Sequence, residues 1–457
     1  MLDIIIVAIY FIGMICIGIF ALSRGKASKK DSFFVADRSG SRLIICGSLC
    51  ATIIGASAVV GMAGLGYSRG LTGAWWLLAG TIGLLILSVF FARKVRDFGL
   101  YTLPELIERQ YDKNTGIVVA ILIVIAWLGV IAAQIVAASV VLSVLIPLST
   151  TILMIIIASI FIIYTVLGGQ YSIIRTDFIQ TIILFIGILT CTGFLASKLI
   201  HTGSITGSLP SDFFSFPVST QFGWTDLLSL LILVGATYVV GPDIYSRLFC
   251  AKDQQVARSS AWITALILIP VAFVIVFIGM GAKLLFPGIA PEESFSTIIG
   301  ELLPVGVSGL VIAALLAAIM SSADTCMLTT SAILTEDIIK RFSPNMAERK
   351  ALIVTRINIF VIGIGSLIIA VVIGGVIKSL LLAYTIFTSG VVIPVIAGFY
   401  KQQLKVTATG AFVAVIGGGG TALIIKLLGI NNLDLLGFGV CIILLFLVSR
   451  FTYKKAE

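Results

Sequence analysis

The chain has 457 residues, of which 59% are hydrophobic and 11% are charged, and its formal net charge is +9. A soluble domain carries roughly 25% charged residues, so this composition cannot supply the polar surface that a water-soluble enzyme of this length needs. The basic residues lie in short loops between apolar segments and do not gather on one segment, which excludes a nucleic-acid-binding protein.

The apolar residues form blocks of about 20 residues, the length that crosses roughly 30 Å of hydrocarbon. A backbone in lipid must satisfy its own hydrogen bonds, so each block is predicted to be a helix. The first block carries Asp3 instead of a positive n-region, which favours a membrane span over a signal peptide. The thirteen predicted spans, numbered in chain order, are 2–22, 42–67, 73–92, 115–146, 149–167, 173–196, 224–247, 258–283, 304–338, 352–375, 379–399, 405–427 and 433–450.

The distribution of lysine and arginine predicts the orientation. With thirteen spans and the N-terminus outside, 25 of the 30 basic residues lie in inner loops or at inner helix ends. The five on the outer side are Arg69, Lys198, Lys283, Lys378 and Lys426. Cytoplasmic loops carry an excess of basic residues, so we predict a multi-pass protein of the plasma membrane with its N-terminus outside and its C-terminus in the cytoplasm.

Two spans contain helix-breaking residues at corresponding places. The second has Gly55 near its middle, and the seventh has Gly235 followed by Gly241–Pro242. Transport sites use discontinuous helices in corresponding positions of two repeats. The five-helix spacing therefore predicts inverted repeats of spans 2–6 and 7–11. We divide the chain into a peripheral first helix with a cytoplasmic loop (1–41), a first repeat with an external loop (42–223), a second repeat (224–404), and two peripheral helices with a cytoplasmic tail (405–457).

Two carboxylates lie inside predicted spans, where an ionisable group is a functional hypothesis by default. Asp324 shares a helix face with Ser321 and Thr325, by their i, i+3, i+4 spacing. Such hard oxygen ligands suit a cation of the sodium type, although serines also bond back to their own helix. Asp177 is either functional or an interfacial residue paired with Arg175. Three further carboxylates are interpreted as interfacial charges: Asp243, Glu336 and Asp337.

Four stretches carry a family resemblance, in this order along the chain: ATIIGASAVVGMAG (51–64), GGQYSIIRTDFIQ (168–180), GPDIYSRLFCAKD (241–253) and AAIMSSADTCMLTTSAILTEDI (317–338). The sequence resembles the sodium:solute symporter family, whose members carry proline, pantothenate, sialic acid or glucose with sodium. The resemblance covers essentially the whole chain. It implies an all-α polytopic membrane protein of about thirteen helices with a LeuT-type core of five plus five helices.

The resemblance also implies binding residues. The sodium site would use backbone carbonyls of Ala51, Ile54 and Ala318 and the hydroxyls of Ser321 and Ser322. A second cation site, present in some members, would use Asp177, Ser321, Asp324 and Thr325. Asp324 departs from the family pattern, where a hydroxyl residue is usual, so this site would be more anionic or would hold a proton. The solute would lie beside Gly55, Ala56, Ser57, Gln134 and Tyr238.

We therefore predict a sodium-coupled secondary symporter that imports a small polar organic solute by alternating access. The first broken helix lacks the polar residues of sugar-binding members, which favours an amino acid, a carboxylate or a vitamin-like solute over a sugar. One alternative is proton coupling through Asp324 or Asp177. An alternative of another class is a membrane sensor or channel that does not transport. A membrane-embedded enzyme is disfavoured, because no histidine, cysteine or paired-carboxylate constellation converges in the sequence.

Overall fold

A computed structural model describes residues 1–23, 29–202, 209–430 and 433–453, and these residues form helices without a β-strand. Parts of the predicted cytoplasmic loop, external loop and cytoplasmic tail lie outside the described residues. The α-helices are α1 Leu2–Ser23, α2 Lys30–Val35, α3 Arg42–Ile53, α4 Ala63–Arg69, α5 Trp75–Ile86, α6 Ala92–Asp97, α7 Leu103–Gln110, α8 Lys113–Ser143, α9 Thr150–Thr202, α10 Trp224–Leu230, α11 Ala236–Val240, α12 Pro242–Cys250, α13 Gln254–Leu285, α14 Ser294–Leu302, α15 Val307–Ile333, α16 Lys340–Phe342, α17 Glu348–Ile373, α18 Val376–Phe387, α19 Ile393–Gly398, α20 Lys401–Leu404, α21 Ala408–Leu427 and α22 Leu436–Thr452.

Short π-helical or 3₁₀ segments join several of these helices into longer rods. Within the described residues, nine rods are long and apolar enough to cross a membrane. Two of them, Ser57–Asp97 and Thr150–His201, have 41 and 52 residues, about twice the length of one crossing. Three shorter apolar helices accompany them, at Leu2–Ile17, Arg42–Ile53 and Leu436–Thr452. The count of thirteen crossings remains a prediction.

The long helix α9 folds back on itself at Gly169. This residue has φ 61° and ψ 179°, a backbone conformation open mainly to glycine. The Tyr164 hydroxyl lies 2.7 Å from Thr176 Oγ1, whereas twelve residues of a straight helix would separate them by about 18 Å. α9 is therefore two helices joined by a sharp turn, as the separate predicted spans 149–167 and 173–196 require.

Polar side chains fix where the core helices begin. Asp112 caps α8 by accepting from Thr115 N at 2.8 Å, and Asp253 caps α13 by accepting from Val256 N at 2.7 Å. These caps start both helices a few residues before the apolar blocks do. Helix α14 was not predicted, because its nine residues are too short to register as a span.

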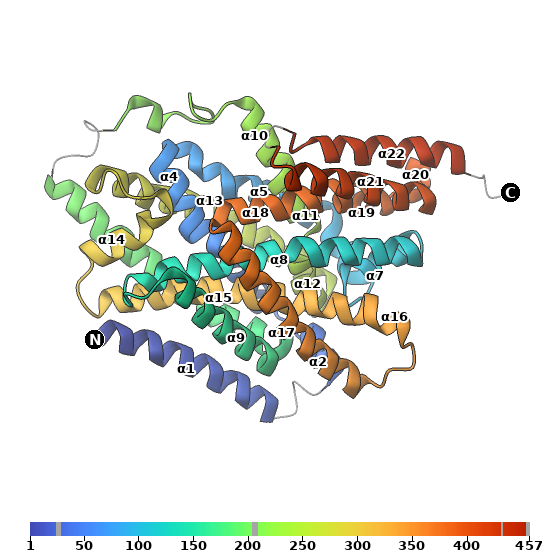
Figure 1. Ribbon diagram of the computed structural model, residues 1–457, viewed down its shortest axis with the longest axis horizontal. Coiled ribbons are helices and arrows are strands. Elements are labelled where there is room, and N and C mark those ends of the chain that lie inside the picture. The colour runs from blue at the N-terminus through green and yellow to red at the C-terminus, as the bar shows by residue number, and fades with distance from the viewer. Residues whose placement is uncertain (24–28, 203–208, 431–432, 454–457) are drawn as a thin grey trace.

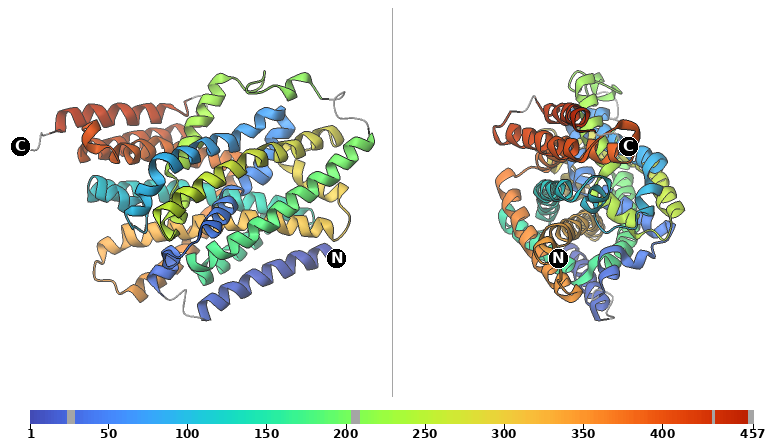
Figure 2. Two further views of the ribbon diagram at one scale, coloured as in Figure 1. Left: turned by 180° about the vertical axis from the view of Figure 1, so that it is seen from behind. Right: turned by 90° about the vertical axis from the view of Figure 1, so that its right-hand side faces the viewer.

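The helices run roughly side by side in one bundle (Figure 1). Helix α1 lies along one side of the bundle, and α21 and α22 lie along the opposite side (Figures 1 and 2). Helix α15 crosses the interior, and 94% of the apolar stretch of its rod, Val307–Phe342, is buried. The most deeply buried rod is therefore the one that carries the predicted serine and aspartate cluster. The start of α1 and the end of α22 lie at opposite ends of the bundle, which agrees with an odd number of crossings (Figure 1).

Candidate functional site

The helix that begins at Arg42 stops inside the bundle. α3 ends at Ile53, and Ile54 leaves the helix with φ −85° and ψ 56°. The chain resumes as a π-helical segment, η3 (Ser57–Met62). Ile53 and Ile54 are both buried, so the last carbonyls of α3 lose their intrahelical partners away from water.

Gly55 is required at this break because other helices approach it closely. A Cβ on Gly55 would lie 2.2 Å from Ser322 Oγ of α15 and 3.0 Å from Gln134 Oε1 of α8. The Gln134 oxygen accepts a hydrogen bond from the N–H of Ala56 at 2.9 Å. The break is therefore held between α8 and α15.

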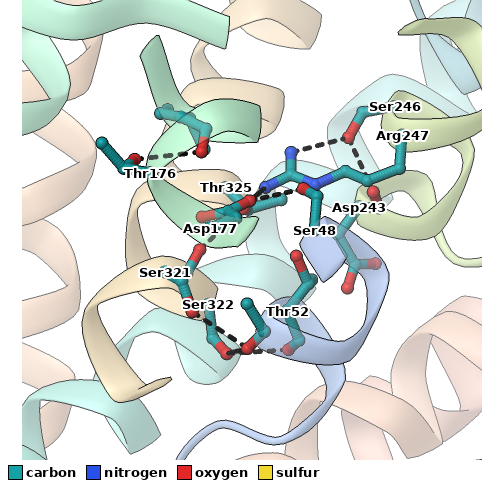
Figure 3. Close-up of polar contacts among 12 residues, drawn as sticks. Ser48, Thr52, Thr176, Asp177, Asp243, Ser246, Arg247, Ser321, Ser322 and Thr325 are labelled. Carbon is teal, nitrogen blue, oxygen red and sulfur yellow. Dashed lines mark hydrogen bonds and ion pairs between the residues drawn. The ribbon is translucent and has the colours of Figure 1, made fainter. Parts of the chain in front are cut away.

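Two serines of α15 meet the carbonyls of the break (Figure 3). Ser321 Oγ lies 2.9 Å from Ala51 O and 2.8 Å from Ala318 O. Ser322 Oγ lies 2.7 Å from Thr52 O, 3.2 Å from Ala51 O and 3.2 Å from Ala318 O. These five oxygens share only two hydroxyl protons, so the buried group has more acceptors than donors. Such a cluster favours a cation with a preference for oxygen ligands.

The structure thus brings together four of the five residues predicted for the sodium site: Ala51, Ala318, Ser321 and Ser322. Ile54 lies at the same break, but in the described part of the chain no hydrogen bond joins it to the serines. Thr52, which the sequence analysis missed, contributes a carbonyl oxygen instead. Carbonyl and hydroxyl oxygens are ligands of the kind that sodium prefers.

A buried ion pair lies beside this cluster (Figure 3). Arg247 Nη2 donates to Asp177 Oδ2 at 2.8 Å, and the two side chains are 0% and 1% exposed. The same carboxylate oxygen accepts from Ser48 Oγ, and the same nitrogen donates to Thr325 Oγ1. Thr325 in turn donates to Ser321 O at 2.6 Å, which connects the ion pair to the serine cluster.

The predicted pairing of Asp177 with Arg175 is wrong. Arg175 stacks on the Tyr171 ring at 3.6 Å and donates to Tyr171 O at 2.9 Å. Residues two apart on a helix point in nearly opposite directions, which would have excluded this pair from the sequence. Arg247 is one of the 25 basic residues that the orientation argument assigned to inner loops and helix ends; it does lie in the last turn of α12, but its side chain is fully buried in the core.

Asp324 is buried but lies outside this ion-pair group. Its Oδ1 accepts from Thr165 Oγ1 of α9 at 2.9 Å. Of the four residues predicted for a second cation site, the structure links Asp177, Thr325 and Ser321 through Arg247 and places the carboxylate of Asp324 on another neighbour. The second cation site stays a prediction, and the Arg247 guanidinium lies among the residues predicted for it.

A small cavity of about 20 Å³ lies between the two helix breaks. α11 ends at Val240, Gly241 leaves the helix with φ −51° and ψ 127°, and α12 begins at Pro242, which cannot donate a backbone hydrogen bond. The cavity contacts Gly55, Ser57, Gln134 and Tyr238 of the predicted solute site, whereas Ala56 does not line it and is hydrogen-bonded to Gln134 instead. Its other lining residues are Thr52, Ile53, Trp127, Val130, Thr237, Asp243, Ile244, Ser322, Cys326 and Tyr384.

Asp243 is the functional candidate that the sequence analysis assigned incorrectly. It was interpreted as an interfacial charge near a cytoplasmic end, but it lines the cavity in the first turn of α12. Its position directly after Gly241–Pro242 was the available signal, because a break that exposes backbone to a transport site also brings its flanking side chains there.

Comparisons with known proteins agree with this geometry. The model of the sodium:solute symporter family matches residues 33–418. A sodium/glucose cotransporter of Vibrio parahaemolyticus is 26% identical, over 94% of this chain and 86% of that protein. Human sodium/myo-inositol cotransporter 2 is 24% identical over 80% of this chain. The alignment with that human protein covers 60% of its length, and the one with zebrafish (Danio rerio) sodium/glucose cotransporter 4 covers 61%.

The solved structure of a Na⁺-coupled sialic acid symporter, in a substrate-bound outward-open state, superposes with a TM-score of 0.80. It is 18% identical and covers 99% of this chain and 98% of its own. The predicted all-α, LeuT-type membrane fold is thereby confirmed. The sequence argument against a sugar finds no support, since all three of these relatives are named for glucose or myo-inositol.

Proposed function

The chain belongs to the sodium:solute symporter family and is a sodium-coupled solute symporter, and from this premise we propose that sodium binds where α15 meets the break after α3. The observation that carries the proposal is the five-oxygen cluster with only two hydroxyl protons. The ligands would be the carbonyls of Ala51, Thr52 and Ala318 and the hydroxyls of Ser321 and Ser322. Ile54, which the family pattern adds, would join through its own carbonyl at the same break.

The solute would bind in the cavity next to this cluster. Ser322 and Thr52 belong to both sites, since each lines the cavity and takes part in the oxygen cluster. A cation that draws these oxygens together would order the break, and with it the cavity wall formed by Gly55 and Ser57. Coupling then follows from linkage: sodium raises the affinity for solute by the same factor by which solute raises the affinity for sodium.

Alternating access requires the cavity to open to each side in turn. At about 20 Å³ it has room for roughly one water molecule, so an organic solute enters only after the surrounding helices move. The two breaks that meet here support the division into repeats 42–223 and 224–404, with 1–41 and 405–457 peripheral. We place the N-terminus outside and the C-terminus in the cytoplasm of a cell whose plasma membrane holds the protein.

We further propose that one sodium ion moves in each cycle. The Arg247 guanidinium already pairs with Asp177 and Thr325, so a fixed positive charge occupies the group in which the second cation was predicted. A second mobile cation there would face repulsion from a charge only one side chain away.

A titration of thermal stability tests the sodium site and this stoichiometry together. In purified protein, NaCl but not KCl at equal ionic strength is expected to raise the free energy of unfolding. Above the dissociation constant, one bound ion stabilises by about 1.4 kcal/mol for each tenfold increase in sodium. A slope of about twice that value would show two ions, and equal stabilisation by potassium would remove the proposed site.

The close contact at Gly55 gives a further prediction. In Gly55→Ala, the new methyl group would displace Ser322 Oγ and Gln134 Oε1, and overpacking of this kind costs about 1–3 kcal/mol. We expect the apparent affinity for sodium, measured from the sodium concentration that stabilises the protein, to fall by about tenfold. Gly193→Ala is the matched control, because a Cβ at Gly193 meets nothing within 4 Å. An unchanged sodium response in Gly55→Ala would contradict the assigned contact between the break and α15.

A further inference from the structure

The cavity contains a carboxylate without a cationic partner. Asp243 is partly exposed toward the cavity, and within the described residues no lysine, arginine or histidine nitrogen lies within 4.0 Å of it. Arg247 is one helical turn away, but its Nη2 donates to Asp177 and Thr325 (Figure 3). An unpaired carboxylate inside a membrane protein is costly and marks a binding site by default.

Three aromatic rings line the same cavity. Trp127, Tyr238 and Tyr384 are 1%, 5% and 8% exposed, and each contacts the cavity from a different helix. Tyr384 is itself stacked on Trp76, with 6.4 Å between ring centroids, which holds its orientation. Aromatic faces attract a cation through their quadrupole, most strongly where water is excluded. A carboxylate together with three rings complements a positively charged group better than a neutral or anionic one.

One hydroxyl that lines the cavity has no hydrogen-bond partner among the described residues. Thr52 is 7% exposed and lines the cavity, and its Oγ1 has no hydrogen-bond partner among the described residues. Gln134 Oε1 accepts a hydrogen bond from the N–H of Ala56. This bond identifies which end of the amide group is the oxygen, and the other end is an NH₂ donor. Buried polar groups are normally satisfied, so the Thr52 hydroxyl indicates a polar group of a bound solute.

We propose that the transported solute carries a positively charged nitrogen, either a protonated amine or a quaternary ammonium, that binds between Asp243 and the three rings. The inference rests on the proposed function, because it assigns a solute class to the cavity beside the sodium cluster. A neutral polyol would leave the Asp243 charge unpaired. A simple carboxylate would be repelled by it.

The test measures solute binding to the purified full-length chain in NaCl by the shift in its melting temperature. The probes are choline, ethanolamine, putrescine and L-proline, together with the uncharged choline isostere 3,3-dimethylbutan-1-ol, glucose, myo-inositol and pyruvate. We expect stabilisation by at least one nitrogen cation and none by the uncharged isostere. Asp243→Asn should weaken the binding of that cation at least 30-fold, the usual result of removing one partner of a buried charge pair.

Asp253→Asn is the matched control, because Asp253 lies ten residues away outside this cavity and asparagine also caps a helix. Sodium alone should stabilise Asp243→Asn as much as the unmodified protein. Absence of a shift with every nitrogen cation, or a shift that Asp243→Asn leaves intact, would overturn the inference. Loss of the sodium-only response in Asp243→Asn would also overturn it, by assigning the carboxylate to the ion. Failure of sodium to stabilise the unmodified protein would instead contradict the proposed sodium site.

Discussion

Replacing Ser321 and Ser322 together by alanine is expected to abolish sodium-stimulated uptake while the protein still reaches the membrane. The change removes two of the five clustered oxygens and leaves the helix backbone unaltered. A hydrogen-bond-type contact to a charged group is worth about 1.5–3 kcal/mol, so losing two should weaken sodium binding roughly 100-fold or more. Proteoliposomes with an inward sodium or an inward potassium gradient measure the effect as the ratio of the two uptake rates.

Single variants separate the two hydroxyls. Ser322 lies between the oxygen cluster and the cavity, so Ser322→Ala should weaken the binding of both sodium and solute. Ser321→Ala should weaken mainly the binding of sodium. Ser366→Ala is a suitable control, because Ser366 is also a buried helical serine and lies on α17, outside both sites. Sodium-stimulated uptake that survives in both single variants would refute the assignment of the hydroxyls.

Arg247→Gln is expected to be the most destabilising single substitution in the core. It leaves the Asp177 carboxylate buried at 1% exposure without its cation, and breaking a buried pair in this way costs about 3–5 kcal/mol. The melting temperature of the detergent-purified protein, and the amount recovered from membranes, should both fall sharply.

A double variant tests whether the lost stability comes from breaking the ion pair or from the loss of packing by the Arg247 side chain. Asp177→Asn combined with Arg247→Gln removes both charges, and much of the lost stability should return because paired residues are not additive. Arg175→Gln is the control, since Arg175 is near Asp177 in sequence but stacks on Tyr171. If the double variant were as unstable as the sum of the two single variants, the pair would not be the source of the effect.

The membrane fold could be predicted because its physical signal is strong. Apolar blocks of spanning length define helices without any knowledge of their neighbours. The fold-back within α9 was also predictable, since the short linker between the two predicted spans contains Gly169, whose positive φ makes the turn. The short helix α14 and the starts of α8 and α13 depend on local caps that hydropathy does not register.

The candidate site was predictable where several small residues share one helix. Ser321 was found because a cluster of hydroxyls is unusual in an otherwise apolar span, and Ser322 and Ala51 followed from the family resemblance. Arg247 and Asp243 were misassigned for one shared reason. Both lie just after Gly241–Pro242, and the sequence does not reveal whether the chain beyond a break leaves the membrane or turns into the core. In the structure α12 packs inward, which buries Arg247 and aims Asp243 at the cavity.

Sequence spacing also could not predict which neighbouring helix each buried polar side chain of α15 contacts. Asp324 was grouped with Ser321 and Thr325 by helical spacing, yet its carboxylate accepts from Thr165 on α9. Neighbouring positions on one helix face can contact different helices, because a buried helix such as α15 is surrounded on all sides. Asp324 is therefore close to the serines of the proposed sodium site in sequence, but its carboxylate hydrogen-bonds to Thr165 instead of to that site.

The central claim is that sodium binds at the break after α3 through the serines of α15. Equilibrium binding of radiolabelled sodium to the purified protein tests it most directly. The account predicts one saturable sodium per chain, displaced by unlabelled sodium but not by potassium, and none in Ser321→Ala/Ser322→Ala. Sodium binding of unchanged affinity in that double variant would contradict the account.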